Sequence, residues 1–300
     1  GMKLKKNYNL PLDKFIDLFL YSKKFGYYIK KNPFGKESDF ITAPNISRLF
    51  SEMIAVWIIS FWQSLGSPKN FNLVELGAGN GEMMKILVES FNNFPVFLKS
   101  CNFIIHEKSP SLIKIQKKKL DRTKIVWVSK ISSIKKNPSI FVANEFFDAI
   151  AIKQFKKKDN LWFERYVNFN GEKGNFFFEK KIDIKKFEKK INFKISNKQN
   201  FIEYSEIGLK YLKDITKIIK KNTGGLLLID YGYTEKKMKN TLQAISNHKF
   251  ANILENIGNS DITHNISFNL FKNFVKKIGD LSNNLTTQKE FLTQMKIEQR

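Results

Sequence analysis

Apolar side chains recur at helical spacing in the first part of the chain. Between residues 46 and 65 they stand three and four positions apart, as on the buried face of a helix, and Gly66 follows as a stop signal. A shorter amphipathic segment at 14–23, with Asp13 as its candidate N-cap, precedes it. The pattern therefore predicts two helices before the first strand.

Beyond residue 66, short apolar runs alternate with segments of helical period. This alternation predicts a mostly parallel, doubly wound, Rossmann-like α/β sheet. The expected strands are 71–76, 102–106, 124–128 and 139–143, and the expected helices are 82–91 and 111–120.

The pattern changes after about residue 148. Residues 151–183 alternate apolar and polar side chains around turns at Asp159-Asn160 and Asn170-Gly171, which predicts antiparallel hairpins. The stretch 234–260 is rich in Lys and Asn and shows a less regular pattern. The remaining expected elements are a helix at 207–220, a strand at 226–230 and a helix at 268–278.

These patterns predict the organisation of the chain. A helical segment over 1–66 precedes an α/β domain over 67–300. That domain carries an inserted lobe of β-hairpins and helix, with insertions at about 151–205 and 234–265.

A glycine-rich turn, Glu75-Leu76-Gly77-Ala78-Gly79-Asn80-Gly81, joins the first expected strand to its helix. Glycines at 77, 79 and 81 bend the chain tightly and let its backbone approach a ligand. Their spacing differs from the G-x-G-x-x-G of dinucleotide sites, and no Lys-Ser/Thr pair follows as in phosphate-binding loops. Glu75 would repel a pyrophosphate but suits the cationic methionine end of S-adenosylmethionine (AdoMet). A purely structural turn is the alternative interpretation.

Acidic and amide side chains follow two other strands, where ligands bind in a doubly wound sheet. The carboxylate of Glu107 can accept hydrogen bonds from both ribose hydroxyls of a cofactor, although it could instead cap the next helix. Asn144 ends the fourth strand, and Glu145 and Asp148 follow it. Paired carboxylates bind a guanidinium bidentately; a helix cap and an exposed acid are the alternative.

Two further polar groups stand late in the chain. Asp230 ends the fifth strand and Tyr231 follows it, and Asp261, Thr263 and His264 form a second cluster. We take these as candidates for the substrate site. A lone histidine is weak evidence for catalysis, and we predict no metal site.

The formal net charge of +24 suggests a nucleic-acid or membrane partner. Only four of the 52 basic residues are Arg, however, and abundant Lys, Asn, Ile and Phe are typical of an AT-rich coding sequence. We therefore interpret most lysines as a solvated surface and favour a protein substrate over nucleic acid. Cys101 is the single cysteine, which excludes an intrachain disulfide. No apolar run is long enough to span a membrane, so we expect a cytoplasmic protein.

Together these motifs resemble the MidA family of AdoMet-dependent methyltransferases, which includes mitochondrial complex I assembly-factor methyltransferases. The Asp-Phe-Ile-Thr-Ala-Pro and Asn-Glu-Phe-Phe-Asp elements are the most specific matches. The matching segments are Gly26-Tyr27-Tyr28, Asp39-Phe40-Ile41-Thr42-Ala43-Pro44, the glycine turn, Asn144-Glu145-Phe146-Phe147-Asp148-Ala149, Ile229-Asp230-Tyr231-Gly232, Asp261-Ile262-Thr263-His264-Asn265 and Thr286-Thr287-Gln288-Lys289-Glu290-Phe291-Leu292.

The resemblance implies a class I methyltransferase fold with an added lobe and AdoMet as methyl donor. In the mitochondrial members it also implies symmetric dimethylation of an arginine in a complex I subunit. It places Asp39, Phe40, Thr42 and Pro44 in a loop that closes over the substrate.

The chain departs from the family pattern at a few positions. Ser38 and Asn45 replace the usual Gly and Glu on either side of the loop, and Asn256-Ile257-Gly258 lacks the usual Pro-Gly. Relatives usually continue beyond the point that corresponds to Arg300, so we expect a short or truncated member.

The resulting hypothesis is N-methylation of a protein arginine. Glu75, the three glycines, Glu107 and Asn144 would bind AdoMet, and Glu145 with Asp148 would hold the guanidinium. An RNA or small-amine methyltransferase, favoured by the charge, is the first alternative. A non-catalytic assembly chaperone that retains an AdoMet pocket is the second, and the glycine spacing disfavours a dinucleotide-dependent oxidoreductase.

Overall fold

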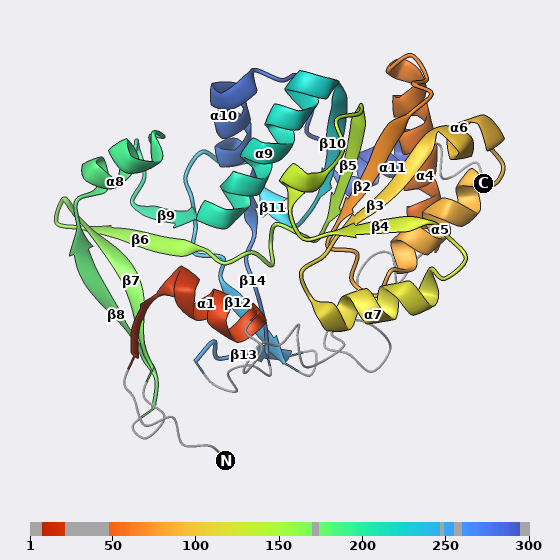
Figure 1. Cartoon of the computed structure of the whole chain (residues 1–300). Coiled ribbons are helices and arrows are strands. Elements are labelled where there is room, and N and C mark those ends of the chain that lie inside the picture. The colour runs from red at the N-terminus through yellow and green to blue at the C-terminus, as the bar shows by residue number, and fades with distance from the viewer. Residues whose placement is uncertain (1–7, 22–47, 170–173, 247–248, 255–259, 295–300) are drawn as a thin grey trace. The chain divides into compact units, whose positions relative to one another are not determined.

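The computed structural model describes residues 8–21, 48–169, 174–246, 249–254 and 260–294 (Figure 1). The chain forms two units that interleave along the sequence. The first, here called the β-rich unit, takes the described residues within Gly1–Lys30, Phe147–Lys210 and Tyr231–Phe274. The second, here called the α/β unit, takes those within Lys31–Phe146, Tyr211–Asp230 and Val275–Arg300. The predicted domain boundary between residues 66 and 67 stays a prediction.

A five-stranded parallel sheet forms the centre of the α/β unit (Figure 1). Its order is β10-β5-β2-β3-β4, and every neighbouring pair is parallel. The chain order reverses beside β2, which makes the carboxyl ends of β2 and β5 the switch point where doubly wound sheets bind ligands. The strands are β2 (Phe71–Leu76), β3 (Cys101–His106), β4 (Ile125–Val128), β5 (Ser139–Asn144) and β10 (Gly224–Ile229).

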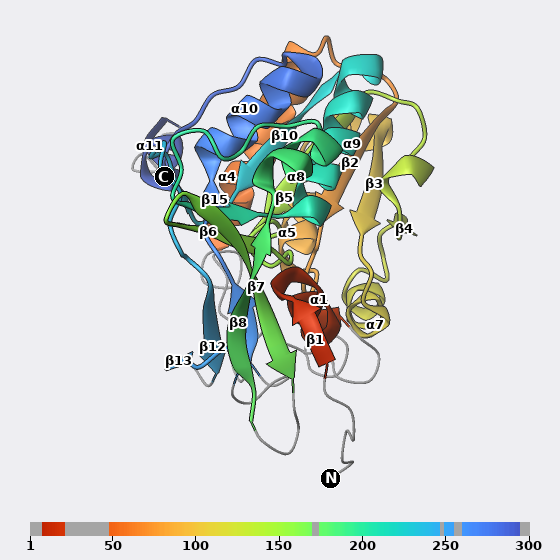
Figure 2. The ribbon, with the colours of Figure 1, turned by 90° about the vertical axis from the view of Figure 1, so that its left-hand side faces the viewer.

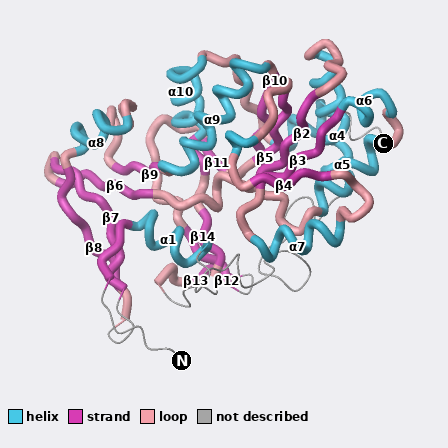
Figure 3. Tube along the Cα trace, viewed as in Figure 1, coloured by secondary structure: helices cyan, strands magenta, loops and turns pink. Residues whose placement is uncertain are grey.

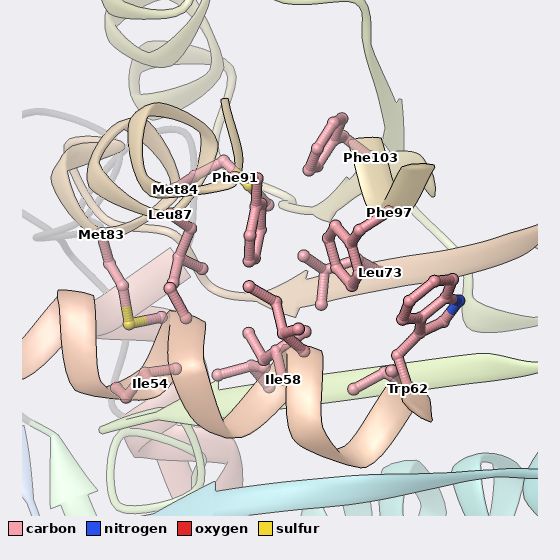
Figure 4. Packing of buried hydrophobic residues seen from close by; sticks show 14 of the residues in the cluster. Ile54, Ile58, Trp62, Leu73, Met83, Met84, Leu87, Phe91, Phe97 and Phe103 are labelled. Atoms are coloured by element: carbon pink, nitrogen blue, oxygen red, sulfur yellow. The ribbon is translucent and has the colours of Figure 1, made fainter. Parts of the chain in front are cut away.

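Helices α4 and α5 cover one face of this sheet with a continuous apolar core. Figure 4 shows Ile58 and Trp62 of α4 packed with Leu73 of β2. The Phe97 ring of α6 lies 5.3 Å from the Trp62 ring and 4.4 Å from the Phe91 ring. The helices and 3-10 turn with residues in this unit are α4 (Arg48–Ser64), α5 (Glu82–Phe91), α6 (Pro95–Ser100), α7 (Pro110–Lys119), η1 (Ile131–Ser133), α9 (Glu206–Asn222), α10 (Phe268–Gly279) and α11 (Gln288–Gln294).

Antiparallel strands dominate the β-rich unit (Figures 2 and 3). The larger sheet has the order β1-β7-β6-β9, with β8 paired to β7, and a second sheet has the order β13-β12-β14. A two-stranded parallel pair joins β11 to β15. The elements are β1 (Tyr8–Pro11), α1 (Leu12–Tyr21), β6 (Lys153–Lys158), β7 (Leu161–Phe169), β8 (Phe176–Ile182), α8 (Ile184–Ile191), β9 (Phe201–Tyr204), β11 (Gly232–Tyr233), β12 (Gln243–Ser246), β13 (Lys249–Ala251), β14 (Asp261–Thr263) and β15 (Ile266–Ser267).

The hairpin predicted at Asp159-Asn160 is confirmed. Both residues have positive φ, 45° and 61°, as a two-residue type I′ turn between β6 and β7 requires. The turn predicted at Asn170-Gly171 lies outside the described residues.

The less regular structure that the sequence indicated over 234–260 is wrong for the central part of this stretch. Residues of β12 pair with β13 on one side and with β14 on the other, so this stretch contributes two strands to a small sheet. Since three to four residues are too few to show alternation, the pattern gave no signal there. Within the described ranges, no helix combines the length and apolarity that crossing a membrane would require.

Candidate functional site

The glycine turn between β2 and α5 adopts a left-handed backbone at each of its three glycines. The φ angles of Gly77, Gly79 and Gly81 are 64°, 54° and 82°, a region that side chains with a Cβ rarely occupy. The Gly77 N–H donates to the His106 carbonyl at 3.0 Å, which holds the turn against β3. A Cβ on Gly77 would stand 2.8 Å from a ring carbon of Phe146. The sequence therefore needs glycine at 77 for two independent reasons.

Glu75 places a carboxylate inside the α/β unit, immediately before this turn. Its side chain is 3% exposed, and its Oε2 receives no hydrogen bond from any described residue. Burial, reinforced by the charge of Glu107, raises the pKa of Glu75 to about 8. A buried acceptor of this kind is costly unless a ligand completes it.

Asn144 supplies a second buried acceptor across the switch point. Its Oδ1 likewise receives no hydrogen bond from the described part of the chain. The register pairs Glu75 with Val142, and Val142 belongs to the core that α4 and α5 cover. Because side chains alternate along a strand, Asn144 and Glu75 project from the same face of the sheet. Two acceptors at this edge suit an ammonium group, which has only donors.

Glu107, one residue beyond β3, is partly engaged by its own loop. Its Oε1 accepts the N–H groups of Lys108 and Ser109 at 2.8 and 2.9 Å. Burial raises the pKa of Glu107, while these hydrogen bonds oppose the shift. The N-cap of α7 is Ser109, not Glu107, since Ser109 accepts from the Leu112 N–H. A carboxylate has acceptor capacity beyond these bonds, so the predicted ribose contact stays a prediction.

Gln116 of α7 links the glycine turn to the carboxylate of Glu107. Gln116 was not among the site residues predicted from the sequence. Its Nε2 donates to the Gly79 carbonyl at 2.8 Å and to Glu107 Oε2 at 3.3 Å. Its Oε1 accepts from Trp127 Nε1 of β4 at 2.9 Å. The side chain is fully buried at one turn from Leu112. A polar residue at a position of α7 where the helical pattern expects an apolar one was therefore the signal that could have identified Gln116.

An aromatic cluster lies on the opposite face of the sheet. His106 Nε2 lies 2.9 Å from the Tyr211 hydroxyl, and its Nδ1 lies 3.1 Å from the Val128 carbonyl. Burial, helped by the charge of Lys108, lowers the pKa of His106 to about 4, so the ring is neutral. Because a carbonyl only accepts, Nδ1 carries the proton and Nε2 accepts from Tyr211.

This cluster fixes Phe146, the ring that lies against Gly77. The Phe146 ring is 5.2 Å from the Tyr211 ring and 6.3 Å from the His106 ring, edge-on in both cases. Tyr211 is remote in sequence, and only the fold brings it to β3. The cluster therefore links the glycine turn to the segment that follows β5.

Glu145, the predicted guanidinium ligand, follows β5 in a strained conformation. Its φ is 48°, unusual for a residue with a side chain, and its N–H donates to the Ile229 carbonyl at 2.8 Å. Such strain clusters at binding and catalytic sites. Its Oε2 is buried. Asp148 belongs to the β-rich unit, so the predicted pairing of these two carboxylates stays a prediction.

The late polar residues fall in two places. Asp230 follows β10 in the α/β unit, and Tyr231 is 62% exposed in the β-rich unit. Asp261, Thr263 and His264 are buried together in the β-rich unit. Their predicted role toward a substrate stays a prediction.

His264 is held by backbone oxygens. Its ring Nε2 lies 2.9 Å from the Ile150 carbonyl, and its backbone N–H donates to the Asp148 carbonyl. Burial lowers the pKa of His264. The predicted loop residues Asp39, Phe40, Thr42 and Pro44 lie outside the described residues.

A parallel sheet of this order, with a glycine turn at its switch point, is the doubly wound arrangement that binds nucleotide-like ligands, and it agrees with the class I methyltransferase fold. A family model described as "Putative S-adenosyl-L-methionine-dependent methyltransferase" matches residues 53–285. The chain belongs to this family, and the predicted resemblance is confirmed.

Relatives and a solved structure agree. The protein arginine methyltransferase NDUFAF7, mitochondrial, of Xenopus tropicalis is 28% identical over 99% of this chain and 74% of its own length. A homologue in Caenorhabditis elegans is 30% identical over 92% of this chain and 70% of its own. A crystal structure of a COG1565 superfamily member from Burkholderia thailandensis, bound to S-adenosyl-homocysteine, has a TM-score of 0.74 at 19% identity. The match covers 90% of this chain and 72% of the chain in that crystal structure. This last likeness supports the fold.

The protein is therefore an AdoMet-dependent methyltransferase. Its residues fit the cofactor, since Glu75 and Asn144 offer buried acceptors to the cationic amino group of AdoMet. The turn at Gly77 is closed to any side chain on its Phe146 side. Which residues contact the cofactor stays a prediction.

Gly77→Ala is expected to weaken AdoMet binding by about tenfold or more, because a new methyl group must displace Phe146. Isothermal titration calorimetry measures the loss. The matched control is Gly66→Ala, where φ is 84° but nothing lies within 4 Å of the new Cβ. It should lower the free energy of unfolding by about 1–2 kcal/mol through backbone strain alone and leave affinity unchanged. Equal affinities of the two variants would contradict this role of Gly77.

AdoMet binding at pH 7 is expected to release close to one proton. Glu75, with its pKa raised to about 8, is mostly protonated in the free protein at pH 7. A bound cation favours the carboxylate, so the proton leaves to the buffer, and the release fades as the pH rises above about 8. Calorimetry in buffers of different ionisation enthalpy measures it. Glu75→Gln should abolish the release and Glu82→Gln should retain it; buffer-independent heats for the wild type would refute the assignment.

Proposed function

We propose that this methyltransferase transfers methyl groups to the guanidino nitrogen of an arginine in a protein. The observation that carries the proposal is Glu145, a strained residue with a buried carboxylate oxygen directly after β5. It follows Asn144, whose side-chain oxygen is buried at the carboxyl end of β5, where the cofactor site is proposed. The names of the relatives, protein arginine methyltransferases, support the same acceptor.

AdoMet supplies an electrophilic methyl group when bound. The work of the protein is then to position the acceptor nitrogen and exclude water, because methyl transfer requires in-line approach and no activated serine or histidine. The Glu145 carboxylate would bind the guanidinium bidentately and orient the nitrogen that accepts the methyl group. The role predicted from the sequence for Asp148 toward the same guanidinium stays a prediction.

The family resemblance extends the proposal to the identity of the acceptor. It supports symmetric dimethylation of an arginine in a respiratory complex I subunit. The cytoplasmic location expected from the sequence stays a prediction. The net charge of +24 favours RNA as the second candidate acceptor, which the experiment below distinguishes.

Deletion of the gene in the source organism should remove symmetric dimethylarginine from one or a few proteins. Quantitative mass spectrometry of arginine methylation measures the loss. The wild type should restore the modification, whereas Glu145→Gln should restore less than about one-tenth of it, since one oriented charge pair contributes roughly tenfold or more.

Two controls make the outcome specific. Glu145→Gln should still bind AdoMet in calorimetry, and Glu235→Gln, at an exposed site, should restore the modification fully. An unchanged set of methylated arginines would contradict the proposal, and so would methyl transfer by the purified protein to RNA alone.

A further inference from the structure

The β-rich unit contains a cavity of about 820 Å³ that the methyl-transfer site does not use. It opens where the β6–β7 hairpin, the end of β8, the start of α8 and the loop before β9 meet. Volumes of about 300–1,000 Å³ are typical of ligand sites, so the space admits several side chains and not only a small ion.

Five lysines from four different segments line this groove. Four of the five are exposed at its rim, and Lys157 is half-buried. Among the residues that the structure describes, none of the five forms an ion pair. The lysines are Lys157, Lys181, Lys185, Lys194 and Lys198.

The two carboxylates in the groove are committed to the backbone. Asp183 Oδ1 accepts the Lys186 N–H at 3.0 Å and caps α8. Glu188 Oε1 accepts two N–H groups, from Ile195 and Ser196, each at 2.7 Å. Burial alone would raise the pKa of Glu188, but these hydrogen bonds, together with the charge of Lys185, lower it overall. The two carboxylates thus hold the loop in shape, and the five lysines leave an excess of positive charge in the groove for an external anion.

The lining favours carboxylates over nucleic acid. No arginine lines the groove, whereas arginine is the residue that binds the phosphates of nucleic acid bidentately. Its one aromatic residue, Trp162, is only 8% exposed and offers little surface on which a base could stack. Leu161, 43% exposed, adds an apolar contact at the rim. An acidic peptide that carries an occasional apolar residue matches this surface.

We propose that this groove docks an acidic segment of the protein substrate, away from the residue to be methylated. The partner's identity as a substrate rests on the proposed function, whereas the binding of an acidic peptide does not. The groove then selects substrates by charge, and the methyl-transfer site acts on an arginine elsewhere in the same protein.

The test is the affinity of a fluorescein-labelled peptide of alternating Glu and Ala, measured by anisotropy at physiological ionic strength. Lys181→Glu with Lys194→Glu is expected to weaken binding by about tenfold or more, since two attractive contacts become repulsive. The neutral pair Lys181→Gln with Lys194→Gln should give an intermediate loss. Both positions are exposed, and circular dichroism verifies folding.

The matched control is Lys213→Glu with Lys217→Glu on the exposed surface of α9, which lowers the net charge equally. It should change affinity by less than about twofold, because surface charges outside the site are screened. Equal losses of affinity in both double variants would show a general charge effect and would overturn the proposal that the groove binds the peptide. Tighter, groove-dependent binding of an oligouridylate of equal charge would overturn the acidic peptide as its ligand.

The two proposals can fail separately. Peptide binding needs neither AdoMet nor methyl transfer, so absent binding overturns the groove and leaves the methyltransferase proposal intact. Groove-dependent binding without any arginine methylation in the cell overturns the proposed acceptor alone.

Discussion

A carboxylate buried at the centre of a parallel sheet is the constraint on which the site depends. Glu75 is the penultimate residue of β2, the strand beside which the sheet reverses its order, and burial raises its pKa to about 8. Asn144 adds a second buried acceptor from the neighbouring strand. Such groups oppose folding of the free protein, and they persist where a ligand completes them. The proposed contact of Glu75 and Asn144 with the cationic amino group of AdoMet would satisfy both buried acceptors.

The surrounding structure holds that ligand site in shape from both faces of the sheet. On one face, Gln116 links the glycine turn to Glu107 and to β4. On the other, the neutral His106 and Tyr211 fix the ring of Phe146 against Gly77. Phe146 directly follows Glu145, so the packing that shapes the turn also orients the residue proposed to bind the guanidinium. The proposed cofactor site and the proposed guanidinium site therefore share the packing around Phe146.

Local signals in the sequence were sufficient for the sheet and for the glycine turn. An apolar run followed by glycines at fixed spacing predicts β2 and α5 with the bounds that the structure has. Contacts between distant residues left no such signal. Tyr211 is more than one hundred residues from His106 in sequence. Likewise, β1 pairs with the last residues of β7, far along the chain. The groove lysines look like solvated surface until the hairpin and α8 bring them together.

The most direct test of the central claim is a crystal structure of this protein with S-adenosyl-homocysteine. We expect the amino group of the ligand to lie within hydrogen-bonding distance of Glu75 Oε2 or Asn144 Oδ1, above the glycine turn. A ligand bound elsewhere, or one whose amino group meets neither of these two acceptors, would contradict it.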